Sequence, residues 1–428
     1  MARLESIYFS PHRSTASLDR VLWTPVRVPV HIERLPQVFW NDGSPWREVN
    51  LWALEQASNR TTSIRTVQAR ISALHSYANW LEDSETDWKA FPARRTDRCL
   101  VRYRGRLIDA RNDGELSPST VSQRMRAVVS FYRWLLSTGQ LQPMYPPWRS
   151  RTLGLRLTDS VGIERTLTVT TTDLSIPNRR VPGEQLEDGL LPLKTSDRDE
   201  LLRLANANAS EELFFFLTLG FFTGMRLGTI ADLRIATLAN ALQEPSVSGL
   251  YRLAIGPQAT PPVATKFGIS GHAWITRVHL DQLLEYAHST RRLKREAKAP
   301  HELANLLFLT RYGNSYAQRG TNKSAALNVE IHSFRKKFVA SRLPHLRHFH
   351  FHQTRCTFAT ELAKIALSAG DATSAIALVQ EALLHKDEAT SLRYIKFLER
   401  NAIKEEAANS FTRDFLGLIE SIKGEKRV

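Results

Sequence analysis

Apolar positions repeat at helical spacing in two segments of the first third of the chain. Residues 64–81 place an apolar side chain every three or four positions, which predicts a helix with one buried face. Residues 117–139 repeat this pattern between a Ser-Pro start and a glycine, as is typical of helix termini. The apolar positions are Ile64, Val67, Ile71, Leu74, Ala78 and Leu81 in the first helix, and Val121, Met125, Val128, Phe131 and Leu135 in the second. With a further helix capped by Ser44 and started by Pro45, residues 45–140 are predicted to form a small all-helical domain.

The pattern changes between residues 141 and 190. A proline-rich break, LQPMYPPW, is followed by RTLTVTTTDLSI, which alternates and is rich in β-branched residues. Such a stretch favours an extended segment or hairpin over a helix. We therefore predict that residues 1–44 are an N-terminal extension, that residues 141–190 are a linker with an extended segment, and that residues 191–428 form a second domain.

The second domain is predicted to combine helices with a small sheet. Thr195 or Ser196 is placed to cap a helix with acidic residues in its first turn. The apolar run 213–222 is too short to span a bilayer and predicts a buried helix. Residues 251–255 and the following apolar stretch are β-like, with residues 266–268 at the tip of a hairpin. The predicted fold class is mainly α with a small β-sheet (α+β).

The charge of the chain indicates a polyanionic partner. The 428 residues have a formal net charge of +15 and a pI near 10.0, with 42% hydrophobic residues, so a folded protein that binds nucleic acid is the leading interpretation. The outer face of the 117–139 helix carries Arg124, Arg126 and Arg133, which we predict to bind DNA. The alternative for each of these arginines is an ordinary solvated surface position.

Cysteine usage and the N-terminus indicate a protein of a reducing compartment. Cys99 and Cys356 are too few and too far apart for a disulfide framework, and no CxxC pair is present for zinc. The first residues lack the apolar core of a signal peptide. We expect a cytoplasmic protein, nucleoid-associated if bacterial, with no membrane partner.

Polar residues suited to phosphate chemistry gather in the C-terminal third. His352 and Arg355 stand three apart, and Tyr394 follows His385 by nine residues, while Arg226 ends an apolar segment far upstream. Transfer of a phosphodiester needs a nucleophile, cations for the non-bridging oxygens and an acid for the departing oxygen. Arginine is always charged and donates two hydrogen bonds to a phosphate. A tyrosine pKa near 10 means that its phenolate needs help from neighbouring groups.

The ordered set of motifs resembles the tyrosine recombinases, also called the phage integrase family. The motifs are TGMRLGTIADLR, the hairpin lysine, HQTRCTFAT and LLHKDEATSLRYIK. The resemblance covers residues 190–400 closely and residues 45–140 more loosely, as the helical core-binding domain of that family. It implies that Arg226 and Arg355 clamp the phosphate, His352 manages the proton of the nucleophile, Lys266 protonates the 5′ oxygen, His385 buttresses the phosphate and Tyr394 is the nucleophile.

The resemblance also implies a function. It is that of a site-specific DNA recombinase that forms a covalent 3′-phosphotyrosyl intermediate, for integration, excision or transposition of a mobile DNA element. Such an intermediate conserves bond energy, so neither a metal nor another cofactor is expected. The expected partners are double-stranded DNA, further copies of the chain as a tetramer on two duplexes, and accessory DNA-binding proteins.

Two departures from the family and three rival interpretations accompany this prediction. Thr229 stands where the family usually has an acidic residue, and Asp232 is the nearby candidate to replace it. The intervals from Arg226 to Lys266 and from Arg355 to His385 are long for the family. The rivals are a type IB topoisomerase-like enzyme, a DNA-binding protein with a decayed active site and a metal-dependent nuclease. The last would use His345, His348, His350 and His352, where HFHFH alternates as a strand would, but no acidic or cysteine ligands cluster with them in the sequence.

Overall fold

The structure is a computed structural model in which the chain falls into two compact units, Met1–Arg180 and Val181–Val428. The boundary lies inside the segment 141–190 that we predicted to be a linker. Helices dominate and the sheets are small, which confirms the predicted α+β fold class. The structure describes residues 1–16, 21–25, 31–59, 62–158, 164–177, 186, 189–319 and 324–425.

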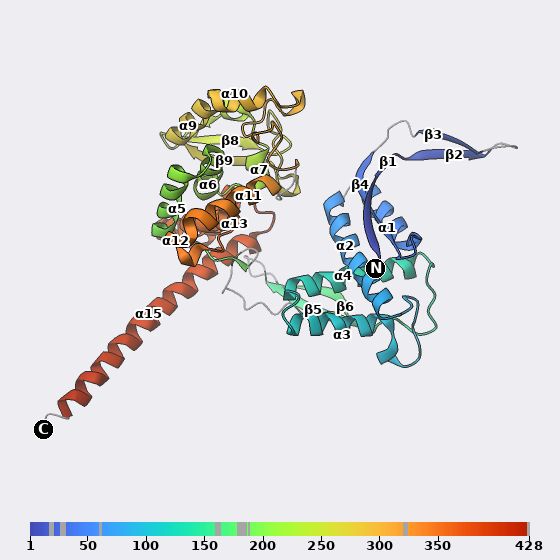
Figure 1. The fold of residues 1–428 in the computed structure, drawn as a ribbon. Coiled ribbons are helices and arrows are strands. Elements are labelled where there is room, and N and C mark those ends of the chain that lie inside the picture. Colours follow the sequence, from blue (N-terminus) through green and yellow to red (C-terminus); the bar gives the residue numbers. More distant parts are fainter. Residues whose placement is uncertain are drawn as a thin grey trace. The chain divides into compact units, whose positions relative to one another are not determined.

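Unit 1 is built on four helices that pack together (Figure 1). They are α1 (Arg47–Ser58), α2 (Ile64–Asp83), α3 (Cys99–Asn112) and α4 (Pro118–Ser137). The apolar positions predicted for the two periodic helices are buried, except that Ile64 is only partly so. Ser117 caps α4 by accepting the amide N–H of Thr120, as the Ser-Pro start predicts.

Three antiparallel strand pairs accompany these helices. They are β1 (Arg3–Phe9) with β4 (Ile32–Phe39), β2 (His12–Ala16) with β3 (Val21–Pro25), and β5 (Ser150–Thr158) with β6 (Glu164–Thr172). The β5–β6 pair shows that the stretch predicted to be an extended segment or hairpin forms a hairpin, which belongs to unit 1. On β4, Ile32, Leu35 and Val38 are buried in the same cluster as the helices. The segment predicted to be an N-terminal extension therefore contributes to the core of unit 1.

The predicted start of α1 is wrong. The helix begins at Arg47 after Trp46, which makes no side-chain cap, and the Ser44 hydroxyl bonds to Asp42 instead. Trp46 is 1% exposed and packs among other aromatic rings. Burial of this large side chain, and not capping, determines where the chain turns into the helix.

Unit 2 places a three-stranded antiparallel sheet among helices. In Figure 1 the strands β8 and β9 lie between α9 and α6. The sheet has the order β7 (Leu242–Gln243), β8 (Leu250–Ile255), β9 (Gly271–Thr276). The helices are α5 (Thr195–Asn208), α6 (Glu211–Thr223), α7 (Leu227–Ala231), α8 (Ile235–Ala239), α9 (Arg277–Ala287), α10 (Thr290–Glu296), α11 (Ala325–Phe334), α12 (Ala340–Arg342), α13 (His352–Ala369), α14 (Ala372–Leu383) and α15 (Glu388–Glu425), with a π-helical turn at Arg335–Val339.

Helix α6 is the buried centre of unit 2, as its apolar run predicts. It approaches α13 closely at Gly220, where a Cβ would lie 2.3 Å from the hydroxyl oxygen of Thr354. The predicted cap of the preceding helix is wrong. Helix α5 begins after Lys194 without a side-chain cap, and the Thr195 hydroxyl donates to Glu361 on α13. The chain therefore uses this hydroxyl for packing between helices.

The alternating HFHFH stretch does not form a strand. It lies in the turn between a short 3-10 helix (Pro344–Leu346) and α13, with Phe349 and Phe351 buried in the core of unit 2. His348 and His350 are exposed. The alternation reflects two buried rings in a turn and not a pleated strand.

Among the helices that the structure describes, none is long and apolar enough to cross a membrane.

Candidate active site

The first candidate arginine follows a glycine that ends α6. Gly224 has φ +65°, a left-handed conformation that favours glycine, and a Cβ there would lie 2.4 Å from Phe358 and 2.7 Å from Leu383. Two residues later, Arg226 is half-buried at the N-cap of α7. The close packing at Gly224 therefore determines where the chain leaves α6 and presents Arg226.

Arg355 ties this turn to the end of α14. Its side chain is 3% exposed, and its Nη1 and Nη2 groups donate to the carbonyls of Gly224 and Leu383, both at 2.7 Å. These two carbonyls precede Arg226 and His385 by two residues each. One guanidinium on α13 thus holds together three segments that are far apart in the sequence. His352, half-buried, begins the same helix one turn earlier.

His385, in the turn between α14 and α15, stacks on Tyr394 of α15. Their rings lie 6.0 Å apart with an interplanar angle of 10°, and Nδ1 of His385 is 2.9 Å from the hydroxyl of Ser391. His385 is 6% exposed and Tyr394 is 0% exposed. The candidate nucleophile therefore lies inside unit 2 in this structure.

Lys266 lies in the connection between β8 and β9, as predicted, and is exposed. Its Nζ is 5.1 Å from the ring centre of Phe267, and Nζ of Lys386 lies 5.9 Å from the same ring. Lys386 directly follows His385. At the base of this contact the side chain of Leu384 packs against Gly271 of β9, where a Cβ would lie 2.4 Å from Leu384 Cδ2. The lysine connection and the His385 turn are therefore neighbours.

Asp232 supports the chain segment that leads to Lys266. Its buried carboxylate accepts the amide N–H of Ala264 at 2.7 Å and Nε of Arg319 at 3.1 Å, and Arg319 also donates to the carbonyl of Pro262. Thr229, at the position that is usually acidic in the family, is also buried. Asp232 thus provides a buried acidic group in this region, and it acts on the lysine connection.

The contacts link most of the predicted site residues. Arg355 joins the segments that carry Arg226 and His385, and His385 stacks on Tyr394. Sequence reasoning missed Ser391, Arg319 and Phe267. Ser391 lies within the LLHKDEATSLRYIK motif and Phe267 lies beside the hairpin lysine, but the resemblance gives neither residue a role. Arg319 lies outside the motifs and reaches Asp232 only in the folded chain.

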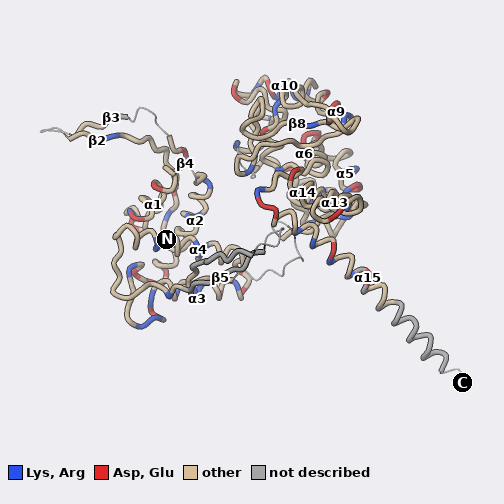
Figure 2. Tube along the Cα trace, turned by 180° about the vertical axis from the view of Figure 1, so that it is seen from behind, with Lys and Arg blue, Asp and Glu red and all other residues tan. Residues whose placement is uncertain are grey.

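The three arginines of α4 differ in exposure. Arg126 and Arg133 are exposed, whereas Arg124 is half-buried and lines a small cavity of about 210 Å³ together with Tyr103. Burial raises the pKa of Tyr103 to about 12, against the opposing positive charge of Arg124. The exposed pair is thus better placed than Arg124 to meet a polyanion. Lys and Arg positions occur in both units, with Asp and Glu between them (Figure 2).

The histidine cluster does not converge. His345 lies 3.1 Å from Asp197 on α5, and His348 accepts a hydrogen bond from Arg347. Although His350 is exposed, partial desolvation of its ring, together with the positive charge of Arg335, lowers its pKa. Within the described parts of the chain, no group of three or more His, Cys, Asp or Glu residues could hold a metal ion.

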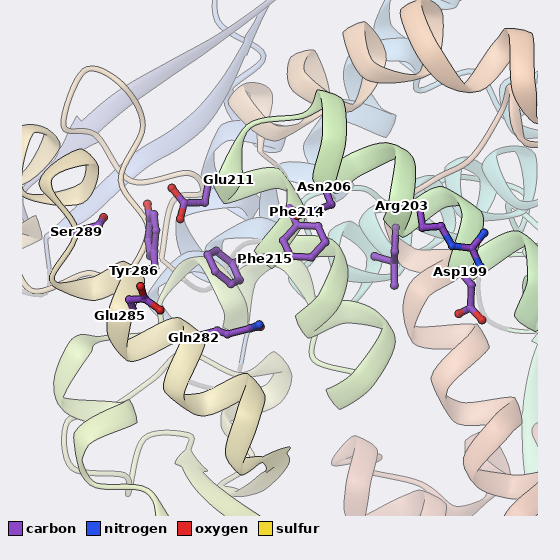
Figure 3. Close-up of a pocket in the computed structure, with 11 residues that line it drawn as sticks. Asp199, Arg203, Asn206, Glu211, Phe214, Phe215, Gln282, Glu285, Tyr286 and Ser289 are labelled. Atoms are coloured by element: carbon purple, nitrogen blue, oxygen red, sulfur yellow. The ribbon is translucent and has the colours of Figure 1, made fainter.

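The cavity in Figure 3 lies apart from these residues. It has a volume of about 740 Å³, and its wall includes Arg203 of α5, Phe214 and Phe215 of α6 and Tyr286 of α9. None of the six residues predicted to act on a phosphate lines it. The candidate site is instead a set of contacts that join the ends of α6 and α14 to helices α13 and α15.

Comparison with known proteins finds similarity at the level of solved structures. No protein-family model matches the chain, and no curated protein does. The XerH site-specific recombinase bound to its difH substrate matches with 16% identity over 80% of each chain and a TM-score of 0.47. The Tn1549 transposon integrase in complex with transposon right end DNA matches with 12% identity over 83% of this chain and 98% of that one, at a TM-score of 0.49. A lambda integrase dimer bound to a COC′ core site matches with 11% identity over 81% and 76% of the two chains, at 0.47.

These solved structures are named as recombinases and integrases, the class that the sequence motifs resemble. The similarity is distant.

Proposed function

We propose that the protein is a site-specific DNA recombinase that cuts and rejoins DNA through a covalent 3′-phosphotyrosyl bond to Tyr394. One observation carries the proposal. The Arg355 guanidinium joins the Arg226 turn to the His385 turn, and His385 stacks on Tyr394. Residues chosen from motifs far apart in the sequence are thus connected through one buried side chain. The same contacts bring an arginine, a histidine and a tyrosine, which suit phosphate binding and nucleophilic attack, into one cluster.

The proposed step exchanges one P–O bond for another. The Tyr394 oxygen attacks phosphorus, its proton passes to His352, and the bond from phosphorus to the 5′ oxygen breaks. The Lys266 ammonium gives its proton to that departing oxygen. Arg226, with Arg355 and His385 behind it, stabilises the charge on the non-bridging oxygens. The reverse step, with a 5′ hydroxyl of another strand, completes strand exchange without a metal or another cofactor.

The burial of Tyr394 adds a requirement to this proposal. With an exposed fraction of 0%, its hydroxyl cannot approach a phosphate while the ring remains stacked on His385. Cleavage therefore requires the first turns of α15 to shift outward. On this proposal, the structure is that of the chain before it cleaves DNA.

The two units would divide the work. We propose that residues 45–140 grip duplex DNA through Arg126 and Arg133, that residues 191–428 carry the chemistry, and that residues 141–190 link the two. The net charge of +15 favours binding that rests on phosphate contacts and weakens with salt. Exchange between two duplexes further requires four active sites, hence a tetramer, with accessory DNA-binding proteins at sites that need bending.

Trapping of the covalent intermediate tests the proposal. The substrate is a duplex from the flanks of the gene that carries a nick close to each candidate cleavage point. Cleavage releases a short fragment with a 5′ hydroxyl, and religation is prevented because this fragment diffuses away. The wild-type protein should form a denaturant-resistant adduct in excess chelator, and Tyr394→Phe should form none. An adduct with Tyr394→Phe would contradict the assignment, and cleavage that needs metal would favour a nuclease.

The remaining outcomes separate the other rivals. DNA binding without any adduct would indicate a binding protein with a decayed site. Relaxation of a supercoiled plasmid that has no target sequence would indicate a topoisomerase-like activity.

A further inference from the structure

Phe267 combines three properties that are unusual together. It is aromatic, it is 71% exposed, and its backbone has φ +66°. Exposure of a single apolar side chain is ordinary on protein surfaces. A left-handed backbone is uncommon for a bulky residue, whereas glycine adopts it without steric cost. The chain thus retains a strained phenylalanine where a glycine would fold more easily.

The contacts around Phe267 place its ring at the exposed side of the candidate active site. The ammonium groups of Lys266 and Lys386 lie 5.1 and 5.9 Å from the ring centre. Lys266 is the candidate acid, and Lys386 follows His385 in sequence. The ring therefore has two positive charges beside it and is itself 71% exposed to the solvent.

The connection that carries the ring is held by hydrogen bonds at two points. On its N-terminal side, Asp232 accepts the amide N–H of Ala264. Within it, the Thr265 hydroxyl donates to the carbonyl of Ile269 at 2.6 Å. A braced turn presents its aromatic ring in one position, and strain maintained in this way is characteristic of functional sites.

We propose that Phe267 stacks on a DNA base next to the phosphate that is cleaved. The inference rests on the proposed function and names a contact that the motifs do not include. Lys266 and Lys386 would bind the phosphates on either side of the ring, and the ring would take the base between them. Base–aromatic stacking tolerates any sequence, and apolar wedges open base steps in this manner. The stacked base would fix the register of the backbone beside Tyr394.

Two substitutions test this stacking against a purely structural role. Phe267→Gly removes the ring and relieves the backbone strain, so its melting temperature should equal or exceed that of the wild type. Phe267→Trp keeps an aromatic ring. The probes are an intact duplex and a nicked duplex with 2-aminopurine beside the nick, and all proteins carry Tyr394→Phe so that no strand is cut.

The protein that retains Phe267 should bind the nicked duplex more tightly than the intact duplex, and its binding should raise the 2-aminopurine fluorescence. Phe267→Gly should lose the fluorescence rise and bind the nicked duplex about tenfold more weakly, while Phe267→Trp keeps both. The salt dependence of binding should not change, because the lysine–phosphate contacts remain.

Equal affinity and equal fluorescence for Phe267→Gly would overturn the inference. A lower salt slope for Phe267→Gly with unchanged fluorescence would also overturn it, because the ring would then only align the two lysines. Absence of DNA binding by the Phe267-containing protein would instead contradict the proposed function, and the inference with it. The two failures are thus distinguishable.

Discussion

The candidate site has a buried half and an exposed half. Arg355, His385 and Tyr394 are 3%, 6% and 0% exposed, whereas Phe267 is 71% exposed beside two exposed lysines. The buried half is held by hydrogen bonds and stacking within the protein, which form when unit 2 folds. The exposed half is available to a partner without rearrangement. Substitutions in the buried half should therefore reduce both stability and activity, and substitutions in the exposed half should reduce activity alone.

The largest effect is expected for Arg355→Ala. The substitution removes the donors to the buried carbonyls of Gly224 and Leu383, and an unsatisfied buried acceptor costs about 1–3 kcal/mol each. Urea unfolding followed by circular dichroism should show this loss, together with loss of the covalent adduct. Arg203→Ala, on an exposed surface pair of α5, is the matched control and should change stability by less than about 0.5 kcal/mol. Equal stability of the two variants would contradict the structural role of Arg355.

A smaller effect is expected for Gly224→Ala. Its left-handed backbone costs a side chain about 1–2 kcal/mol, and the contact with Phe358 and Leu383 adds about 1–3 kcal/mol of overpacking. Gly268→Ala is the control, because its φ of +65° is the same and nothing lies within 4 Å of its Cβ. Thermal unfolding should place Gly268→Ala between the wild type and Gly224→Ala. The same loss in both variants would show that packing at Gly224 is unimportant.

The smallest effect is expected for Asp232, the buried carboxylate that holds the chain segment leading to Lys266. Asp232→Ala should slow cleavage about tenfold, or about 1.4 kcal/mol, because the segment before Lys266 loses its anchor. Asp232→Asn keeps an acceptor for the Ala264 amide, and its cleavage rate should fall between those of Asp232→Ala and the wild type.

Lys266→Ala should slow cleavage about 100-fold or more, because the reaction loses its general acid.

A leaving group that needs no proton separates a positioning role from general damage. DNA with a 5′-bridging sulfur at the cleaved bond should restore the cleavage rates of both Lys266→Ala and Asp232→Ala. Rescue of Lys266→Ala alone would mean that Asp232 does not act through the lysine.

The sequence predicted the elements whose signals are local. The periodic faces of α2 and α4, the buried α6 and the β5–β6 hairpin follow from spacing and composition. The same reasoning failed at HFHFH, because apolar residues at every second position occur both in a strand and in a turn that buries two rings. It failed at Ser44 because burial of Trp46 outweighs a capping preference.

The candidate site shows the same division. The motifs named His385 and Tyr394, whose rings stack, but no spacing reveals that Arg355 binds two backbone carbonyls or that Asp232 reaches Ala264. These contacts join segments that only the folded chain brings together. The burial of Tyr394 likewise follows from how α15 packs on α13 and α14, which the sequence pattern does not specify.

The position of the covalent bond tests the central claim most directly. The adduct trapped on nicked DNA is digested with nuclease and protease, and mass spectrometry locates the residue that carries the nucleotide. The proposal predicts a 3′-nucleotide on the peptide that contains Tyr394 and on no other. A nucleotide attached to any other residue, or a bond from the protein to a 5′ phosphate of the DNA, would contradict it.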